Sequence, residues 1–231
     1  MIACQIPGFI SEAEGEWLSQ KARDGLAIEI GAFEGRSTVY LASAAARVVS
    51  CEPFCGQPTP RRKVPGVDFL EVRRQWHLNI HLSGFGNKVT LVEERSAFAY
   101  PSLLRRFKHA ARLVFVDGEH TESALRTDVC FANLLHIDGI VAFHDYGHKD
   151  FPAVKHVVDR WEGQYGEYFQ RLPRIGRIQA FRKTHLVHVP RLWAEEAGVD
   201  HENSVHSAQF PTSPLAPDSV GKSEPGQWDT E

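Results

Sequence analysis

Cysteine is scarce in this sequence, which argues against two common ways of stabilising or equipping a domain. Only 4 of the 231 residues are cysteine, and no two of them have the C-x-x-C spacing of a zinc knuckle or a redox pair. A disulfide framework is not indicated either, because such frameworks need many cysteines in a short chain. We expect Cys51 and Cys130 to pack as small apolar residues.

Positive charge and long apolar runs are also lacking. The formal net charge at pH 7 is −3, without a basic stripe, whereas proteins that coat nucleic-acid phosphates are clearly basic. No segment is apolar over the ~20 residues that a membrane helix needs, and residues 1–7 lack the basic start and apolar centre of a leader. We therefore expect no nucleic-acid partner, no membrane partner and a cytoplasmic location. A homo-oligomeric state is left open.

The apolar residues that are present alternate between strand-like and helix-like segments. A lead-in helix is predicted within 9–22, where Ser11 and Glu14 form a capping-box pattern. The pattern then predicts strands at 26–30, 47–52, 89–93, 112–117 and 140–143, and helices at 37–46, 69–80, 100–107, 121–136 and 152–165. Residues 169–172 and 177–182 follow as a hairpin. This order predicts an α/β fold: a doubly wound, Rossmann-like, seven-stranded sheet, mostly parallel, with a C-terminal antiparallel hairpin.

Proline and glycine mark the segments that we expect to be irregular. The loop 53–67 contains four prolines and two glycines, and it follows the second strand, next to the expected ligand site, as a candidate lid. The alternating pattern is lost after Thr184, and residues 204–231 are rich in Ser, Pro, Asp and Gly, a composition typical of flexible chain. We predict one domain at 1–183 and a mostly flexible tail at 184–231.

The first predicted strand runs into a glycine turn. The segment Ile28–Thr38 reads I-E-I-G-A-F-E-G-R-S-T, an apolar run followed by two glycines and a helix start. Gly31 permits the tight turn, and we expect Gly35 to let a ligand approach the backbone at the positive end of the helix. The spacing differs from the G-x-G-x-x-G of dinucleotide dehydrogenases. The turn favours an anionic or nucleotide-like ligand, with an ordinary strand-to-helix turn as the alternative.

Polar residues follow all five predicted parallel strands. Glu52 ends the second strand about twenty residues after Gly31, the interval at which α/β nucleotide sites place the carboxylate that binds ribose. The full set is Glu29, Gly31, Glu52, Glu93–Ser96, Asp117–His120, His144 and Asp145. Because ligands bind beyond the carboxyl ends of the strands in such sheets, we expect these residues to gather along one rim.

Two motifs in this set resemble those of a known family. The fourth strand ends in V-D-G-E-H (Val116–His120), and the fifth ends in F-H-D-Y (Phe143–Tyr146). Together with the glycine turn, they resemble a bacterial family of class I S-adenosylmethionine-dependent methyltransferases and, more distantly, the catechol-type O-methyltransferases. The resemblance spans about residues 6–182, and several separated motifs in the right order are more specific than any one of them.

The resemblance implies a place for each part of the cofactor, S-adenosyl-L-methionine. The methionine end would lie beside the glycine turn, with Ser37 near its carboxylate. Glu52 would accept both ribose hydroxyls, a task that suits a carboxylate, and Ser96 would contact adenine. The expected cofactor-binding residues are Glu29, Gly31, Ala32, Phe33, Ser37, Glu52, Ser96 and Asp117.

The resemblance also implies an acceptor site at the ends of the fourth and fifth strands. In the catechol-type enzymes three oxygen ligands hold magnesium there, and a basic side chain three residues past the first ligand removes the acceptor's proton. The matching metal positions are Asp117, His144 and Asp145, and His120 stands where the base belongs, which gives His120, His144 and Asp145 as expected catalytic residues. Magnesium prefers oxygen ligands, whereas imidazole suits manganese, iron or zinc. Two interpretations stay open: a divalent ion (Mg or Mn) binds, or the His-Asp pair acts without metal.

The resemblance implies methyl transfer to an oxygen of a small hydroxyl-bearing molecule, such as a sugar, a phenol or a secondary metabolite. A neutral His120 with an ordinary pKa of about 6.5 would suit proton removal at neutral pH. The alternatives are an NAD-dependent oxidoreductase and a non-catalytic S-adenosyl-binding protein. Single residues also have plainer interpretations: Glu52 as a solvated strand end, His120 as a helix-start residue and His144 as a histidine paired with a neighbouring carboxylate.

Overall fold

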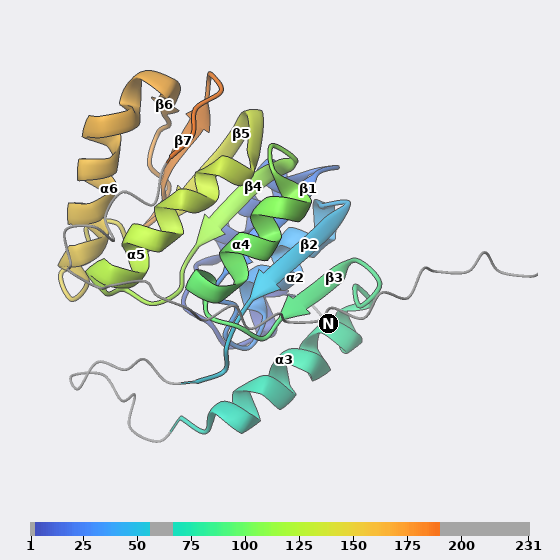
Figure 1. The fold of residues 1–231 in the computed structure, drawn as a ribbon. Helices are drawn as coiled ribbons and strands as arrows, with labels where there is room; N and C mark the ends of the chain where they lie inside the picture. Colours follow the sequence, from blue (N-terminus) through green and yellow to red (C-terminus); the bar gives the residue numbers. More distant parts are fainter. Residues whose placement is uncertain (1–2, 56–66, 190–231) are drawn as a thin grey trace, which may run out of the picture. The chain divides into compact units, whose positions relative to one another are not determined.

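Five parallel strands and a C-terminal hairpin form the sheet at the centre of the molecule (Figure 1). The computed structural model describes residues 3–55 and 67–189, which belong to one compact unit, Met1–Ala197. The strands of these residues are β1 (Leu26–Ile30), β2 (Arg47–Cys51), β3 (Val89–Val92), β4 (Ala111–Val116), β5 (Leu135–Phe143), β6 (Phe169–Arg171) and β7 (Gln179–Lys183). Their order is β3-β2-β1-β4-β5-β7-β6, and β7 runs antiparallel to both neighbours. The predicted fold class is confirmed.

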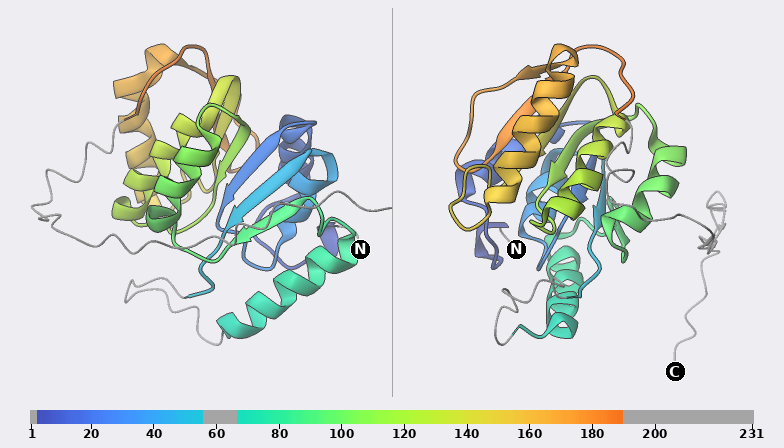
Figure 2. Two further views of the ribbon diagram at one scale, coloured as in Figure 1. Left: turned by 45° about the vertical axis from the view of Figure 1, so that its right-hand side comes forward. Right: turned by 60° about the vertical axis from the view of Figure 1, so that its left-hand side comes forward.

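Helices cover both faces of this sheet (Figures 1 and 2). They are α1 (Glu12–Ala22), α2 (Arg36–Ala44), α3 (Phe69–Ser83), α4 (Ser96–Phe107), α5 (Glu122–Asp128) and α6 (Pro152–Tyr165), with 3₁₀ turns η1 (Ala3–Gln5), η2 (Val129–Leu134) and η3 (Gly166–Tyr168). The helices α1, α2 and α3 share a core with Ala27 and Leu113, whereas α4, α5 and α6 share one with Ile28 and Val114. Because successive side chains of a strand point to opposite faces, the central strands are buried on both sides.

The register of the sheet aligns the carboxyl ends of its central strands. Ile30 pairs with Cys51 of β2 and with Val116 of β4, and Val116 pairs with Phe143 of β5. The residue after each of these positions therefore leaves the sheet beside the others. The four residues so placed are Gly31, Glu52, Asp117 and His144.

Two predicted helices differ from the structure. The helix predicted at 121–136 ends at Asp128 and continues as η2, after which β5 begins at Leu135. Gly139, predicted to open the fifth strand, lies inside it where the β4–β5 register shifts, and a side chain there would come within 2.9 Å of the Ala111 oxygen. The predicted helix is longer than α5 because η2, which follows it, is also buried and mostly apolar. Periodicity alone does not separate η2 from α5.

The start of α4 also differs from the prediction. The helix begins at Ser96 and contains Pro101 inside it, whereas proline preference for the first turn placed the start near Tyr100. Pro101 has no N–H to bond with the carbonyl four residues earlier, so the helix continues past one missing hydrogen bond.

The two ends of the described domain are tied to its body. At the N-terminal end, the predicted capping box is present between Ser11 and Glu14. At the other end, the chain continues past Lys183 to Val189, whose backbone N–H and oxygen both hydrogen-bond with the Asn133 side chain. Most of the predicted tail, 190–231, and most of the candidate lid, 56–66, lie outside the described residues. Within the described residues, every helix is too short or too polar to cross a membrane.

Candidate active site

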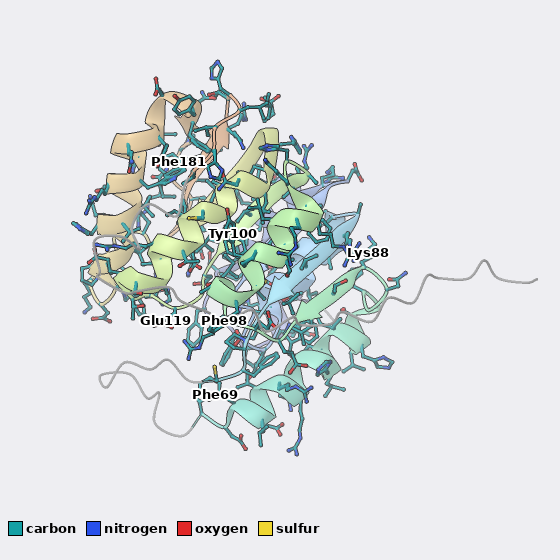
Figure 3. The ribbon with its side chains drawn as sticks, in the orientation of Figure 1. Phe69, Lys88, Phe98, Tyr100, Glu119 and Phe181 are labelled. Atoms are coloured by element: carbon teal, nitrogen blue, oxygen red, sulfur yellow. The ribbon has the colours of Figure 1, made fainter. Side chains whose placement is uncertain are left out.

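A cavity of about 1000 Å³ opens at the edge of the sheet where the central parallel strands end. Its walls come from the glycine turn, the strand ends, the starts of α4 and α5, and the segment before α1. Glu119, Phe98 and Phe69 lie at this end of the sheet (Figure 3). The volume is at the upper end of the range of about 300–1000 Å³ for small-molecule sites, which suits two ligands side by side. Of the residues predicted to bind cofactor, the wall includes Gly31, Ala32, Phe33, Ser37, Glu52, Ser96 and Asp117.

The glycine turn presses the end of β1 against the end of β4. Gly31 has a φ of +85°, and a Cβ there would lie 2.2 Å from the backbone oxygen of Asp117. Both facts require glycine. Gly35 has a φ of +91° and directly precedes α2 as its N-cap, but a Cβ on it would face Trp76 of α3 at 3.2 Å. The missing side chain of Gly35 thus makes room for α3, not for a ligand as the sequence suggested.

Glu52 closes the same turn from the β2 side. Its Oε2 accepts hydrogen bonds from the amides of Ala32 and Phe33, both at 3.1 Å, and its Oε1 accepts one from the Phe54 amide at 2.9 Å. Burial raises the pKa of Glu52 above its ordinary value, although the three amides oppose this shift. The carboxylate is therefore fixed in the cavity wall, and its interpretation as a solvated strand end is wrong.

Glu29 lies beneath the turn, outside the wall of the cavity. Its Oε2 accepts hydrogen bonds from the hydroxyls of Thr38 and Ser50, both at 2.6 Å, and burial raises its pKa to about 7. Ser37 is buried and touches the same carboxyl, but it also lines the cavity. Glu29 thus supports the turn from below, whereas Ser37 is within reach of a ligand.

Ser96 begins α4 in a polar corner of the cavity. The adjacent Arg95 forms an ion pair with Glu119 at 3.0 Å and contacts the sulfur of Cys55 at 3.7 Å. Behind Ser96 lies the fully buried carboxyl of Asp128, whose pKa is raised by burial to about 7. The corner therefore joins the segments that follow β2, β3 and β4.

The residues predicted for the acceptor side form one cluster. The Nδ1 of His144 lies 3.0 Å from the Oδ1 of Asp117. The Nε2 of His120 lies 3.3 Å from the Oδ2 of Asp145 and 3.7 Å from the Oδ1 of Asp117. The His120 ring also stacks on Phe151, with ring centroids 4.0 Å apart. All four residues meet as the strand order predicts, and the stacking restrains the plane of the His120 ring.

The carboxylates of the cluster change the acid–base properties of both histidines. Burial would lower the pKa of His120, but Asp117 and Asp145 outweigh it and raise that pKa to about 9. Burial also opposes protonation of His144, yet Asp117, Glu14 and Asp145 raise its pKa to about 10. Both imidazoles are therefore protonated at neutral pH in this arrangement. The expectation of a neutral His120 with an ordinary pKa is wrong.

Three residues of the cluster lie close enough to share a metal ion. The ligand atoms of Asp117, His120 and Asp145 all lie within 4.8 Å of one another. The predicted ligand His144 is 1 % exposed, and its Nδ1 is turned to Asp117. Among the described residues, His120 therefore takes the place beside Asp117 and Asp145 that the sequence predicted for His144. Two carboxylates and one imidazole suit manganese, iron or zinc better than magnesium.

Sequence reasoning missed three side chains around this cavity. Phe9 lines the wall ahead of α1, and Arg177, between β6 and β7, pairs with Asp145 at 3.3 Å. Glu14 was predicted as a capping residue only, yet its carboxylate also lies 3.7 Å from the Nε2 of His144. The capping box was the one signal that pointed to Glu14. No local pattern indicates Phe9 or Arg177, because their contacts depend on how distant segments meet.

Comparison with known proteins agrees with the fold. A family model described as "Methyltransferase domain" matches residues 28–146, more than half of the chain, from β1 to just beyond β5. The matched range includes the glycine turn and the acid–histidine cluster, by which we mean Asp117, His120, His144 and Asp145.

Solved structures share the fold at low sequence identity. A protein from Corynebacterium glutamicum has a TM-score of 0.57 and 19 % identity, over 80 % of this chain and 86 % of that chain. An O-methyltransferase from Bacillus cereus, in complex with SAH, has a TM-score of 0.51 and 17 % identity, over 78 % and 86 %. An rRNA methylase from Streptococcus thermophilus has a TM-score of 0.54 and 12 % identity, over 77 % and 100 %.

Proposed function

The chain belongs to the methyltransferase-domain family, as an S-adenosylmethionine-dependent enzyme, and from this premise we propose that it methylates a hydroxyl oxygen of a small molecule. One observation carries the proposal: the glycine turn with its bound Glu52 lines the same cavity as Asp117, His120 and Asp145. His144, predicted as catalytic, is buried behind this wall. Methyl transfer requires the sulfonium methyl and the attacking oxygen in line at near contact. Such positioning is worth roughly 7–11 kcal/mol.

We assign the cofactor to the β1–β2 side of the cavity. The methionine end would contact the turn at Gly31, Ala32 and Phe33, with Ser37 beside its carboxylate. A carboxylate has about four acceptor positions, and the amides of Ala32, Phe33 and Phe54 occupy three of those of Glu52. One position, on Oε1, remains for a ribose hydroxyl, whereas the resemblance implied that Glu52 accepts both.

The remaining cofactor assignments follow from the cavity wall. Ser96, in the polar corner, is the candidate for the adenine side, and Asp117 meets Gly31 where the methionine end would lie. Glu29 is not assigned a direct contact, because its carboxyl lies beneath the turn and already binds Thr38 and Ser50.

We assign the acceptor to the side where β4 and β5 end. As the acceptor oxygen attacks, the C–O bond forms, the S–C bond breaks, and the hydroxyl proton goes to a base. His120 in its neutral form is our candidate: its Nε2 faces Asp117 and Asp145, which leaves Nδ1 to take the proton. With a pKa of about 9, the neutral form is the minor one at pH 7.

A divalent ion remains a proposal with a changed set of ligands. Asp117, His120 and Asp145 fit an ion by distance and by donor type. A bound ion would lower the pKa of an acceptor hydroxyl. In that arrangement His120 would be a ligand and not the base, so the two roles exclude each other. His144 then holds Asp117 in place through its Nδ1 contact.

We propose a small molecule over nucleic acid as acceptor. The chain carries a net charge of −3, whereas nucleic-acid binding needs a basic surface. Phe9, Phe33 and Phe151 line the cavity, and such aromatic walls suit the apolar face of a phenol or a sugar. The rRNA methylase noted above shares the fold, and its substrate is a property of that protein.

A metabolite screen with methyl-labelled cofactor tests the proposal. We expect label transfer to at least one hydroxyl compound, and calorimetry should show cofactor binding that is strongly weakened in Glu52→Ala. Binding of NAD with indifference to S-adenosyl ligands would contradict the cofactor assignment. Transfer to protein or nucleic acid alone would contradict the acceptor class.

A further inference from the structure

Glu14 is a buried acid that belongs to a helix outside the strand-end motifs. It lies in the first turn of α1 and is 3 % exposed. Its Oε2 accepts hydrogen bonds from the amide and the hydroxyl of Ser11, at 2.7 and 2.8 Å. Its Oε1 accepts one from the amide of Arg177 at 2.6 Å. The carboxylate therefore joins α1 to the segment between β6 and β7.

The same Oε1 faces the acid–histidine cluster. It lies 3.7 Å from the Nε2 of His144, and the side chain of His144 is fully buried. The other charged groups near His144 are Asp117 and Asp145, 3.0 and 3.7 Å from its Nδ1. Gly176 makes this approach sterically feasible, because a Cβ there would lie 2.4 Å from the Glu14 Oε1. The His144 ring thus lies between carboxylates, with Asp117 at hydrogen-bond distance from Nδ1 and Glu14 at ion-pair distance from Nε2.

We propose that Glu14 is a positioning residue of the methyltransferase, which acts through His144 and Asp117 on His120. The Glu14 carboxylate attracts the Nε2 side of the ring at ion-pair distance, which favours the orientation in which Nδ1 meets Asp117. Asp117 in turn faces the Nε2 of His120. This inference rests on the proposed function. It makes α1, which has no strand-end motif, a part of the active site.

Helix capping alone does not account for this arrangement. A capping box is satisfied by glutamate or glutamine, and it works at exposed helix starts. Burying a charged carboxylate is costly unless partners compensate for the lost water. For Glu14 these partners include the Arg177 amide, which donates a hydrogen bond, and the His144 ring at ion-pair distance. The segment directly before α1, Pro7–Ile10, also lines the cavity, so a shift of α1 would move both the wall and the cluster.

Two variants separate positioning from capping. Glu14→Gln removes the charge that faces His144 but keeps a residue that can complete the capping box. Ser11→Ala, the matched control, removes the cap hydroxyl of the same helix and its hydrogen bond to the Glu14 Oε2. It keeps the Glu14 charge, the Ser11 amide bond to Oε2 and the contacts of Oε1 with Arg177 and His144. If E14Q does not fold, Glu14→Asp replaces it, since it keeps the charge and shortens the reach toward His144.

Turnover is measured with the best acceptor from the screen, at a temperature where every variant is folded. We expect E14Q to lower kcat at least about tenfold with the Kd for S-adenosylhomocysteine within about twofold, and S11A to lower the Tm with kcat within about twofold of wild type. Equal losses of kcat in the two variants, or none in E14Q, would overturn the proposal.

A readout without acceptor separates this inference from the proposed function. In ¹⁵N-histidine-labelled protein, with the His144 ring signals assigned from His144→Asn, E14Q should shift those signals and S11A should leave them in place. Unmoved signals in E14Q refute positioning whatever the activity. A wild-type enzyme that methylates no acceptor refutes the proposed function, and the ring signals still decide whether Glu14 orients His144.

Discussion

His120 shows how two neighbouring carboxylates change the chemistry expected of an imidazole. A general base must be neutral to take a proton, and Asp117 and Asp145 raise the pKa of His120 to about 9. In metal-free enzyme, kcat/KM should therefore rise with pH up to about 9 and then level off. His120→Gln should lose this rise and about 10²-fold or more in rate.

The variant also identifies the group that titrates. If the rise came from titration of the acceptor hydroxyl, a pH–rate profile of H120Q in chelator would show the same rise as wild type. A rise centred near the ordinary imidazole pKa of about 6.5 would mean that the two carboxylates do not control His120. The first result would remove His120 as the base, and the second would contradict its raised pKa.

Glu29 predicts a pH dependence of stability, not of rate. Its folded-state pKa is raised from 4.5 to about 7, so between these values the folded protein holds a proton that the unfolded chain releases. The contribution of Glu29 is thus complete below pH 4.5, falls as pH rises through 7, and spans on the order of 3 kcal/mol. Glu29→Gln does not titrate and should lack this fall.

Urea unfolding of wild type and E29Q at pH 5 and pH 8 measures the fall in stability that Glu29 causes. From pH 5 to pH 8, the free energy of unfolding of E29Q should increase relative to that of wild type. Taking the difference between the two proteins removes the pH dependence of all other groups. A relative stability that is the same at both pH values would show that Glu29 is ionised throughout.

At the scale of elements, the glycine turn makes a prediction about both fold and binding. Gly31→Ala would strain a residue at positive φ and push its Cβ into the backbone of Asp117. Gly84, at the end of α3, has a φ of +78° with no atom within 4 Å of an added Cβ, so Gly84→Ala is the control for backbone strain alone, about 1–3 kcal/mol.

G31A should lose more free energy of unfolding than G84A and should also bind S-adenosylhomocysteine more weakly. Denaturant unfolding and calorimetry measure the two effects. Equal destabilisation by the two substitutions, with unchanged affinity, would show that the turn tolerates a side chain and does not hold the cofactor.

Elements differ in how far the sequence predicts them, for physical reasons. The strands β1, β2 and β4 are short apolar runs between turns, so pattern alone finds them, and their parallel order then predicts that Asp117 and His144 meet. The end of α5 is hidden because Val129–Leu134 continues the apolar pattern as a 3₁₀ turn. The bulge at Gly139 depends on its contact with the Ala111 oxygen, which no local pattern records.

Some site residues can be predicted from the sequence, and others become apparent only from the packing. Glu52 was predicted because its distance along the chain from Gly31 reflects the strand–helix–strand unit between them. His120 was predicted to meet Asp117 and Asp145, but its raised pKa follows from interatomic distances that a sequence does not contain. Glu14 reaches His144 across 130 positions of sequence, and only the packing of α1 brings them together.

On the scale of the whole molecule, the boundary of the domain lies later than the loss of sequence pattern suggests. Val189 is buried and binds Asn133 through its backbone. Deletion of residues 204–231, whose composition lacks a core-forming face, should leave the Tm within about 2 °C and cofactor binding unchanged. Deletion from Thr184 should cost more, because it removes the Val189 contacts. A large loss of Tm with the shorter deletion would mean that residues 204–231 pack on the domain.

We propose that one cavity holds the cofactor over β1 and β2 and presents its methyl group to the side where His120 lies. A crystal structure of the complex with S-adenosylhomocysteine should then show a ribose hydroxyl within hydrogen-bond distance of Glu52 and adenine beside Ser96. Its sulfur should face the side of the cavity that contains His120. A ribose bound away from Glu52, or a His120 ring directed away from the sulfur, would contradict it.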